Sequence, residues 1–201
     1  MSGSGRRPLR VLLVEDSEDD ALLLLRELRR AGYEPEHEVV YTAGAMERAL
    51  ERGRWDIARS DHSMPAFSSF AALELLRRRG LFEELPFILV SGKIGEEAAA
   101  AVMKAGAHDY VMKDNLARLG VAIERELQEA EVRRERRRAE RRYRLMFEQS
   151  PLSIQIFSPD GRMVSANRAW RRLWGVEPEQ LAGYNVLEDP QLLESGVMPY
   201  I

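Results

Sequence analysis

Apolar runs and amphipathic stretches alternate along roughly the first 125 residues of the chain. Short apolar runs are typical of strands buried on both faces, and apolar positions three to four residues apart are typical of covering helices. The runs predict strands at 9–14, 38–41, 56–60, 86–90 and 109–112. The amphipathic stretches predict helices at 18–31, 45–51, 70–79, 96–104 and from 116 onward. Five strand–helix repeats favour an α/β fold, a five-stranded doubly wound parallel sheet with helices on both faces.

A long helix is predicted next, because residues 121–148 contain neither glycine nor proline. Its apolar positions, at 116, 119, 123, 127 and 130, follow helical spacing. Beyond residue 130 the same face of the predicted helix carries arginines. About two apolar heptads leave two interpretations open: a solvated spacer, or a coiled coil that forms a homodimer through residues 116–148. A basic arm for nucleic acid is disfavoured, because glutamates interrupt the arginines at a spacing typical of a solvated face.

The pattern changes after residue 150. Apolar stretches at 154–157 and 163–165 flank a Pro-Asp-Gly turn and predict a hairpin. Asn167 is expected to cap a helix that ends before Gly175, with Trp170 and Trp174 in the core, and a further short helix is predicted at 178–182. About 55 residues with one hairpin and two short helices make a thin core, so we expect part of a second, α+β domain.

Composition and charge narrow the classes of protein. The 201 residues, 45% of them apolar, allow one full domain and a remainder or two small domains. The absence of cysteine excludes a disulfide scaffold, a thiol catalyst and a cysteine-based metal site. With no run near the ~18 residues of a membrane span and no signal peptide, we expect a cytoplasmic protein without a membrane partner. The net charge of −3 averages a net −4 over residues 1–115 and a net +5 over residues 131–145, which marks an Arg-rich linker.

Polar side chains stand where the predicted strands end. Glu15 and Asp16 follow the first strand, and the third, fourth and fifth end at Asp61, Ser91 and Lys113. The carboxyl ends of parallel strands share one edge of the sheet, where ligands bind. Clustered carboxylates repel one another unless a hard cation such as Mg²⁺ joins them, and a carboxylate can be the nucleophile that forms an aspartyl phosphate. A lysine and a serine hydroxyl suit the phosphoryl oxygens.

Each of these residues also has an ordinary explanation when taken alone. The acids after the first strand could complement a helix N-terminus, the serine and the aspartate could belong to turns, and the lysine could be solvated. Their joint placement at four strand ends is what favours a site.

Four stretches of the chain resemble the receiver domain of two-component response regulators. They are residues 11–17 (VLLVEDS), 61–65 (DHSMP), 90–92 (VSG) and 105–113 (AGAHDYVMK). The resemblance implies a flavodoxin-like receiver over residues 8–127, preceded by a flexible stretch at 1–7 and followed by a linker helix at 128–145. It also implies that Asp61 is the phosphoacceptor. The implied Mg²⁺ ligands are Glu15, Asp16, Asp61 and the backbone carbonyl of Ser63.

The same resemblance assigns roles around the phosphoryl group. Lys113 would contact that group, Ser91 would be the switch hydroxyl, and Tyr110 would be the switch aromatic. The implied donor is the phosphohistidine of a histidine kinase or of a phosphotransfer protein. A receiver by itself catalyses only its own phosphorylation and dephosphorylation, and we find no output catalytic signature in these residues.

Residues 146–201 resemble the N-terminal part of a PAS sensor domain. The resemblance rests on residues 147–151 (FEQSP), 158–161 (SPDG) and 166–170 (ANRAW). It covers about half of such a domain, so it assigns no bound cofactor. The sequence as a whole thus predicts a receiver, a linker helix and a partial PAS domain.

Four positions depart from the receiver pattern. Arg59 stands where the family has an apolar residue, Ala66 and Ser69 stand where glycines are common, and Asp114 replaces the usual proline. A buried arginine costs several kcal/mol unless it pairs or reaches solvent. Arg59 and the altered loop favour a rival hypothesis, a pseudo-receiver that acts as a phosphorylation-independent dimerisation or interaction module, whereas Asp114 resembles receivers in sensor-kinase-like chains. A haloacid-type phosphohydrolase is disfavoured, because it needs a second aspartate where position 63 is serine.

Overall fold

The computed structural model describes residues 5–62, 64–92, 96–181 and 183–195. The chain divides into two compact units, residues 1–135 and residues 136–201. One long helix, α5 (Leu119–Gln149), runs across the boundary between them. The two units are therefore described one at a time.

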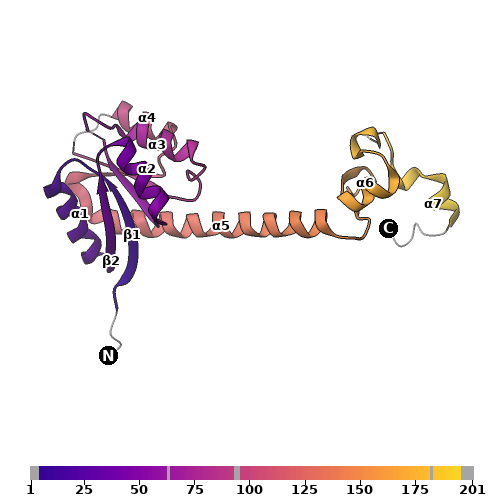
Figure 1. The fold of residues 1–201 in the computed structure, drawn as a ribbon, viewed down its shortest axis with the longest axis horizontal. Helices are drawn as coiled ribbons and strands as arrows, with labels where there is room; N and C mark the ends of the chain where they lie inside the picture. The colour runs from indigo at the N-terminus through magenta and orange to yellow at the C-terminus, as the bar shows by residue number, and fades with distance from the viewer. Residues whose placement is uncertain (1–4, 63, 93–95, 182, 196–201) are drawn as a thin grey trace. The chain divides into compact units, whose positions relative to one another are not determined.

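The first unit is built on a five-stranded parallel sheet (Figure 1). Its strands lie in the order β2-β1-β3-β4-β5, which is the predicted doubly wound arrangement. β1, β3 and β4 are internal and carry the longest buried runs, as expected of strands covered on both faces. Their bounds are β1 (Arg7–Val14), β2 (Tyr33–Val40), β3 (Ile57–Asp61), β4 (Phe87–Ser91) and β5 (Asp109–Met112).

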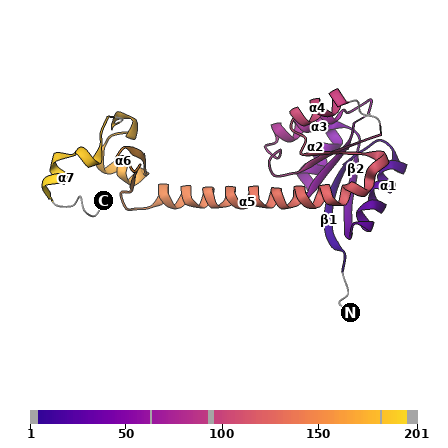
Figure 2. The same cartoon turned by 180° about the vertical axis from the view of Figure 1, so that it is seen from behind.

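Helices cover both faces of this sheet (Figures 1 and 2). α1 (Glu18–Arg30) and the first turns of α5 pack on one face, around Leu13, Leu24 and Ile123. α2 (Ala43–Arg52), α3 (Ser69–Arg78) and α4 (Glu96–Lys104) pack on the other. A short 3-10 helix, η1 (Lys113–Arg118), joins β5 to α5. Because side chains alternate along a strand, β1, β2, β3 and β4 each contribute to both cores, and β5 contributes Val111 to one of them.

The second strand is longer than the sequence pattern predicts. β2 begins at Tyr33 and pairs with β1 over eight residues, whereas the apolar run predicts only 38–41. Its first half alternates glutamates with Tyr33 and Pro35, and the glutamates Glu34 and Glu36 are exposed. A proline is tolerated here because β2 is an edge strand.

The apolar positions at the start of α5 pack within the first unit. Leu119, Ile123 and Ala130 are buried, and Leu116 and Leu127 pack against the same core. A partner helix would therefore have to use the later, Arg-rich part of 116–148, and the homodimer stays a prediction. Among the residues that the structure covers, no helix combines the length and the hydropathy of a membrane span.

The second unit has a two-stranded antiparallel sheet, β6 (Gln155–Phe157) and β7 (Met163–Ala166), as the hairpin pattern predicts. Asn167 caps α6 (Arg168–Trp174), which ends at Gly175 in the left-handed conformation. Trp170 is buried, but Trp174 is 63% exposed, so the prediction of a core position was wrong for Trp174. Both tryptophans lie in one short helix, and the thin unit buries only one side of it. The remaining elements are η2 (Pro178–Leu181), η3 (Val186–Glu188) and α7 (Pro190–Ser195).

Candidate functional site

Three carboxylates meet at the carboxyl edge of the parallel sheet. Glu15 follows the last residue of β1, Asp16 comes next, and Asp61 ends β3. Each offers an oxygen, and these oxygens lie within 4.8 Å of one another. Glu15 and Asp61 are buried, whereas Asp16 is exposed. The parallel pairing of β1 with β3 brings together side chains that are 45 or more residues apart in sequence.

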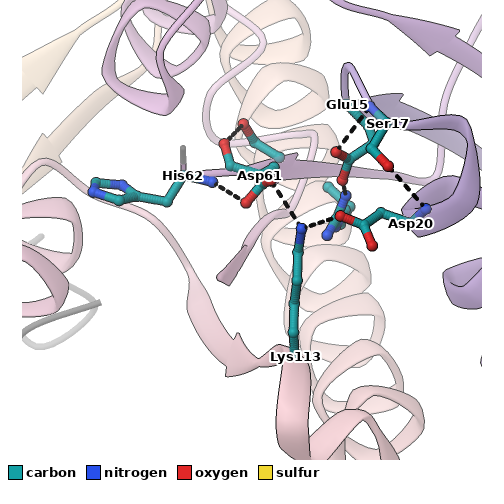
Figure 3. Close-up of polar contacts among 8 residues, drawn as sticks. Glu15, Ser17, Asp20, Asp61, His62 and Lys113 are labelled. Carbon is teal, nitrogen blue, oxygen red and sulfur yellow. Dashed lines mark hydrogen bonds and ion pairs between the residues drawn. The ribbon is translucent and has the colours of Figure 1, made fainter. Parts of the chain in front are cut away.

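Lys113 links this cluster to the first turn of α1. Its Nζ donates to Asp61 Oδ2 at 2.9 Å and also to Asp20 Oδ2, as Figure 3 shows. The sequence predicts Lys113 at this edge but does not identify Asp20. Asp20 stands three residues after Ser17, whose hydroxyl accepts from the Asp20 backbone N–H. An acid at that position usually serves the helix N-terminus, so its sequence signal is ambiguous.

The charges around Asp61 keep it ionised. Burial would raise the pKa of Asp61, but the hydrogen bond and charge of Lys113, together with Arg59, outweigh burial and hold that pKa below its ordinary value. Burial likewise would lower the pKa of Lys113, but its hydrogen bonds to Asp20 and Asp61 prevail and raise it. Asp61 Oδ1 also accepts from the His62 backbone N–H at 2.7 Å. At neutral pH this arrangement presents a carboxylate beside an ammonium group.

Arg59 forms a buried ion pair with Glu15. One guanidinium nitrogen donates to Glu15 Oε2, and both side chains are almost fully buried. The other oxygen of Glu15 accepts from the Ser17 backbone N–H at 3.3 Å. The sequence indicates that Arg59 needs a partner, and the structure identifies Glu15, a predicted metal ligand. The pair lets an arginine occupy a strand that is covered on both faces.

The other predicted site residues lie around this edge. Ser91 ends β4, and its buried hydroxyl has no hydrogen-bond partner among the residues that the structure covers. Tyr110 lies on β5, and its side chain is partly exposed. Lys113 begins η1 directly after β5. The carbonyl of Ser63 lies outside the described residues.

The donor set fits a hard divalent cation and a phosphoryl group. Carboxylate oxygens are the ligands that Mg²⁺ prefers, and the exposed Asp16 leaves one side of the cluster open to water. An ammonium group and an unpaired hydroxyl at neighbouring strand ends complement phosphoryl oxygens. A buried polar atom without a partner, such as Ser91 Oγ, calls for an explanation, and a ligand oxygen supplies one.

Two family models match the chain. Residues 11–124 match the response regulator receiver domain, and residues 141–198 match the PAS domain. The first match covers more than half of the 201 residues and spans the four strand ends that carry the candidate site.

Known proteins of the same kind are similar to this chain. The chemotaxis protein CheY1 of Helicobacter pylori is 25% identical over 105 residues, which are 52% of this chain and 85% of that protein. The sensor histidine kinase TmoS of Ectopseudomonas mendocina is 24% identical over 209 residues, covering 86% of this chain and 21% of that protein. Among solved structures, the signal receiver domain of a signal transduction histidine kinase from Syntrophus aciditrophicus has a TM-score of 0.51 at 27% identity. That match covers 60% of this chain and 90% of the solved one.

Proposed function

Because this chain belongs to the response regulator receiver domain family of two-component systems, we propose that it is a phosphoacceptor whose nucleophile is Asp61. The observation that carries the proposal is the contact of Asp61 with Lys113 inside the carboxylate cluster. The ionised carboxylate of Asp61 supplies the nucleophile, and the ammonium group of Lys113 supplies a positive charge for the incoming phosphoryl oxygens.

In the proposed reaction an oxygen of Asp61 attacks the phosphorus of a phosphohistidine in a histidine kinase or a phosphotransfer protein. A phosphorus–oxygen bond forms as the phosphorus–nitrogen bond breaks, and the imidazole nitrogen leaves with the electron pair. Lys113 and Ser91 then bind phosphoryl oxygens, and Tyr110 responds as the switch aromatic.

Glu15, Asp16 and Asp61, with the carbonyl of Ser63, are the proposed ligands of Mg²⁺. When bound, Mg²⁺ would offset the negative charge that collects on the transferring group. Glu15 and Asp61 come from adjacent strands and hold their oxygens in place through burial, while Asp16 faces solvent. Without a cation, Lys113 and Arg59 are the groups that moderate repulsion among the carboxylates.

We further propose the limits 8–127 for the receiver, 128–145 for the linker and 146–201 for the PAS part, which are close to the family matches at 11–124 and 141–198. The signal would pass from η1 into α5, because Lys113 begins η1 and α5 follows it directly. A homodimer through residues 116–148 is a further proposal for the output of that signal.

Phosphorylation is tested by incubating the chain with acetyl phosphate and MgCl₂ and measuring its intact mass. We expect wild type to gain one phosphoryl group, with acetate as the leaving group, and Asp61→Asn to gain none. Asp114→Asn is the matched control, because Asp114 is an exposed aspartate next to Lys113, and it should behave as wild type.

The same measurement tests the rival function. A pseudo-receiver would gain no mass in wild type, and its oligomeric state would be the same with and without acetyl phosphate. Labelling that persists in Asp61→Asn would place the acceptor elsewhere and overturn the assignment.

A further inference from the structure

Arg59 places a buried positive charge next to the carboxylates of the proposed cation site. β1 and β3 pair in parallel with Leu13 opposite Arg59, and side chains alternate along each strand. Glu15, Arg59 and Asp61 therefore lie on the same face of the sheet, the face that α1 and α5 cover. The residues next to Arg59 on this face are apolar, and Leu13, Ile57 and Ile88 are fully buried.

The guanidinium of Arg59 engages one of the two oxygens that Glu15 could offer to a cation. Glu15 Oε2 accepts from Arg59, and Glu15 Oε1 accepts from the Ser17 backbone N–H. Both oxygens of this carboxylate are thus taken up by the protein itself. Arg59 Nε is buried and has no hydrogen-bond partner in the part of the chain that the structure describes. The guanidinium is therefore held by one charged contact and not by a saturated network.

We propose that Arg59 is an internal counter-ion that sets the divalent-cation affinity of this receiver. In the free protein its charge neutralises Glu15. A cation that binds the carboxylate cluster through Glu15 competes with Arg59 or with the Ser17 backbone N–H for a Glu15 oxygen, and it comes close to the positive charge of Arg59. Arg59 is thus a positioning residue that acts on the cation in two ways, by holding Glu15 and by the repulsion of its own charge. The inference rests on the cation site of the proposed function and adds a device that sets how strongly the site binds.

Electrostatics gives the direction of the effect. Two like charges repel more strongly in a buried site than in water, because the local dielectric constant is lower. A guanidinium in contact with Glu15 therefore weakens cation binding, and an apolar side chain at position 59 would strengthen it. The same replacement leaves Glu15 as a buried carboxylate without its partner, which destabilises the cation-free protein. Cation affinity and cation-free stability should consequently change in opposite directions.

The test measures Mg²⁺ binding to the full chain by isothermal titration, with Mg²⁺ as the only added ligand, and the melting temperature in EDTA and in saturating MgCl₂. We expect Arg59→Met to bind Mg²⁺ about tenfold or more tightly than wild type. It should melt at a lower temperature in EDTA and recover much of that loss in MgCl₂, because a ligand that binds the folded state stabilises it.

Two control variants separate charge from packing. Arg59→Lys keeps a positive charge at the same place and should bind Mg²⁺ within about threefold of wild type. Arg52→Met removes an arginine that pairs with Glu38 on the exposed surface, and it should leave the affinity unchanged. If Arg59 only filled space, Arg59→Lys would differ from wild type as much as Arg59→Met does.

A second pair of variants keeps the test decisive if Arg59→Met does not fold. Glu15→Gln removes the carboxylate but keeps the charge of Arg59, whereas Glu15→Gln combined with Arg59→Met leaves no unpaired buried charge. The double variant should bind Mg²⁺ more tightly than Glu15→Gln alone.

The outcomes distinguish this inference from the proposed function. Binding to wild type without tightening in Arg59→Met, or in the double variant relative to Glu15→Gln, overturns the counter-ion and leaves the cation site standing. Failure of Mg²⁺ to bind wild type and all variants overturns both. Tightening in Arg59→Met together with wild-type affinity in Arg59→Lys supports the counter-ion.

Discussion

Buried polar side chains serve different purposes in the two units. In the described part of residues 136–201 the buried polar residue is Asn167, and its side chain is fully engaged. Its Oδ1 accepts from the backbone N–H groups of Ile154 and Trp170, and its Nδ2 donates to the carbonyls of Phe147 and Leu152. These four bonds tie the end of α5, the segment that leads into β6 and the helix α6 to one another.

In the described part of residues 1–135 most buried polar side chains are charged or incompletely bonded, and several of these lie at one edge of the sheet. Glu15, Arg59 and Asp61 form ion pairs, while Ser91 Oγ and Arg59 Nε have no partner among the described residues. Buried polar atoms are usually satisfied in folded proteins, and exceptions require an explanation. The comparison indicates that the satisfied side chain of Asn167 holds its unit together, whereas the unsatisfied hydroxyl of Ser91 stands at a strand end where the proposed function needs a donor to a phosphoryl oxygen.

The largest expected effect comes from Asn167→Ala. Removing four hydrogen bonds leaves two backbone N–H groups and two carbonyls without partners, which costs about 3 kcal/mol or more. Because the unit buries few side chains, we expect its cooperative structure to be lost. Hydrogen exchange followed by mass spectrometry should show loss of protection in residues 150–175 and unchanged protection in β1, β3 and β4.

The control is Asn115→Ala, which changes an exposed asparagine in the first unit and should leave protection unchanged in both. Retention of protection in Asn167→Ala would show that the second unit is held by something other than this residue.

The second largest effect is expected for Ser91→Ala, which, in contrast to Asn167→Ala, should slow phosphorylation without lowering stability. Because the Ser91 hydroxyl has no partner among the described residues, its removal should leave the free energy of unfolding within about 0.5 kcal/mol of wild type. Labelling by acetyl phosphate should be about tenfold slower, since a hydrogen bond to a charged oxygen contributes about 1.5 kcal/mol. Urea unfolding and the time course of mass gain measure the two quantities.

Ser60→Ala is the control, because the Ser60 hydroxyl is buried in β3 but donates to the Asp61 carbonyl. We expect Ser60→Ala to lose stability. A Ser91→Ala variant that is destabilised but labels at the wild-type rate would contradict the comparison.

The smallest effect concerns a buried carboxyl away from the strand edge. Burial raises the pKa of Glu126 on α5, and although Arg125 acts against this, the net shift is upward. A raised folded-state pKa means that the folded protein keeps a proton that the unfolded chain has lost. Wild type therefore loses stability as the pH rises from the ordinary glutamate pKa of about 4.3 through the raised value.

Glu126→Gln lacks this titration, so its free energy of unfolding relative to wild type should rise over that window and level off above it. Chemical unfolding at a series of pH values measures the difference. Glu135→Gln, an exposed position on the same helix, is the control. A difference that does not vary with pH would contradict the raised pKa.

Local patterns account for most of the first unit. Both 96–104 and 109–112 match the observed bounds of α4 and β5, and the other elements shift by a few residues except β2. β2 was underestimated because an edge strand can alternate exposed glutamates with buried residues, a pattern that an apolar run does not detect. Trp174 was misplaced because helical spacing tells which residues share a face but not how wide the buried face is.

The candidate site likewise has residues that the sequence predicts and contacts that only the structure reveals. Glu15, Asp16, Asp61, Ser91 and Lys113 could be found from the sequence, because the end of a strand is a local feature and parallel strands share one edge. The partner of Arg59 and the role of Asp20 could not, because those contacts join residues 44 and 93 positions apart through particular side-chain orientations.

Chain order and hydrophobic periodicity were therefore sufficient to place the strand ends, and with them the acidic cluster. Only the tertiary structure revealed three further features. They are the packing of α5 against the sheet, the contact of Arg59 with Glu15, and the contacts of Lys113 with Asp20 and Asp61. The physical reason is that hydrophobic periodicity is a property of residues close together in the sequence. The pairing of buried charges depends instead on which side chains the tertiary fold brings within a few ångströms of one another.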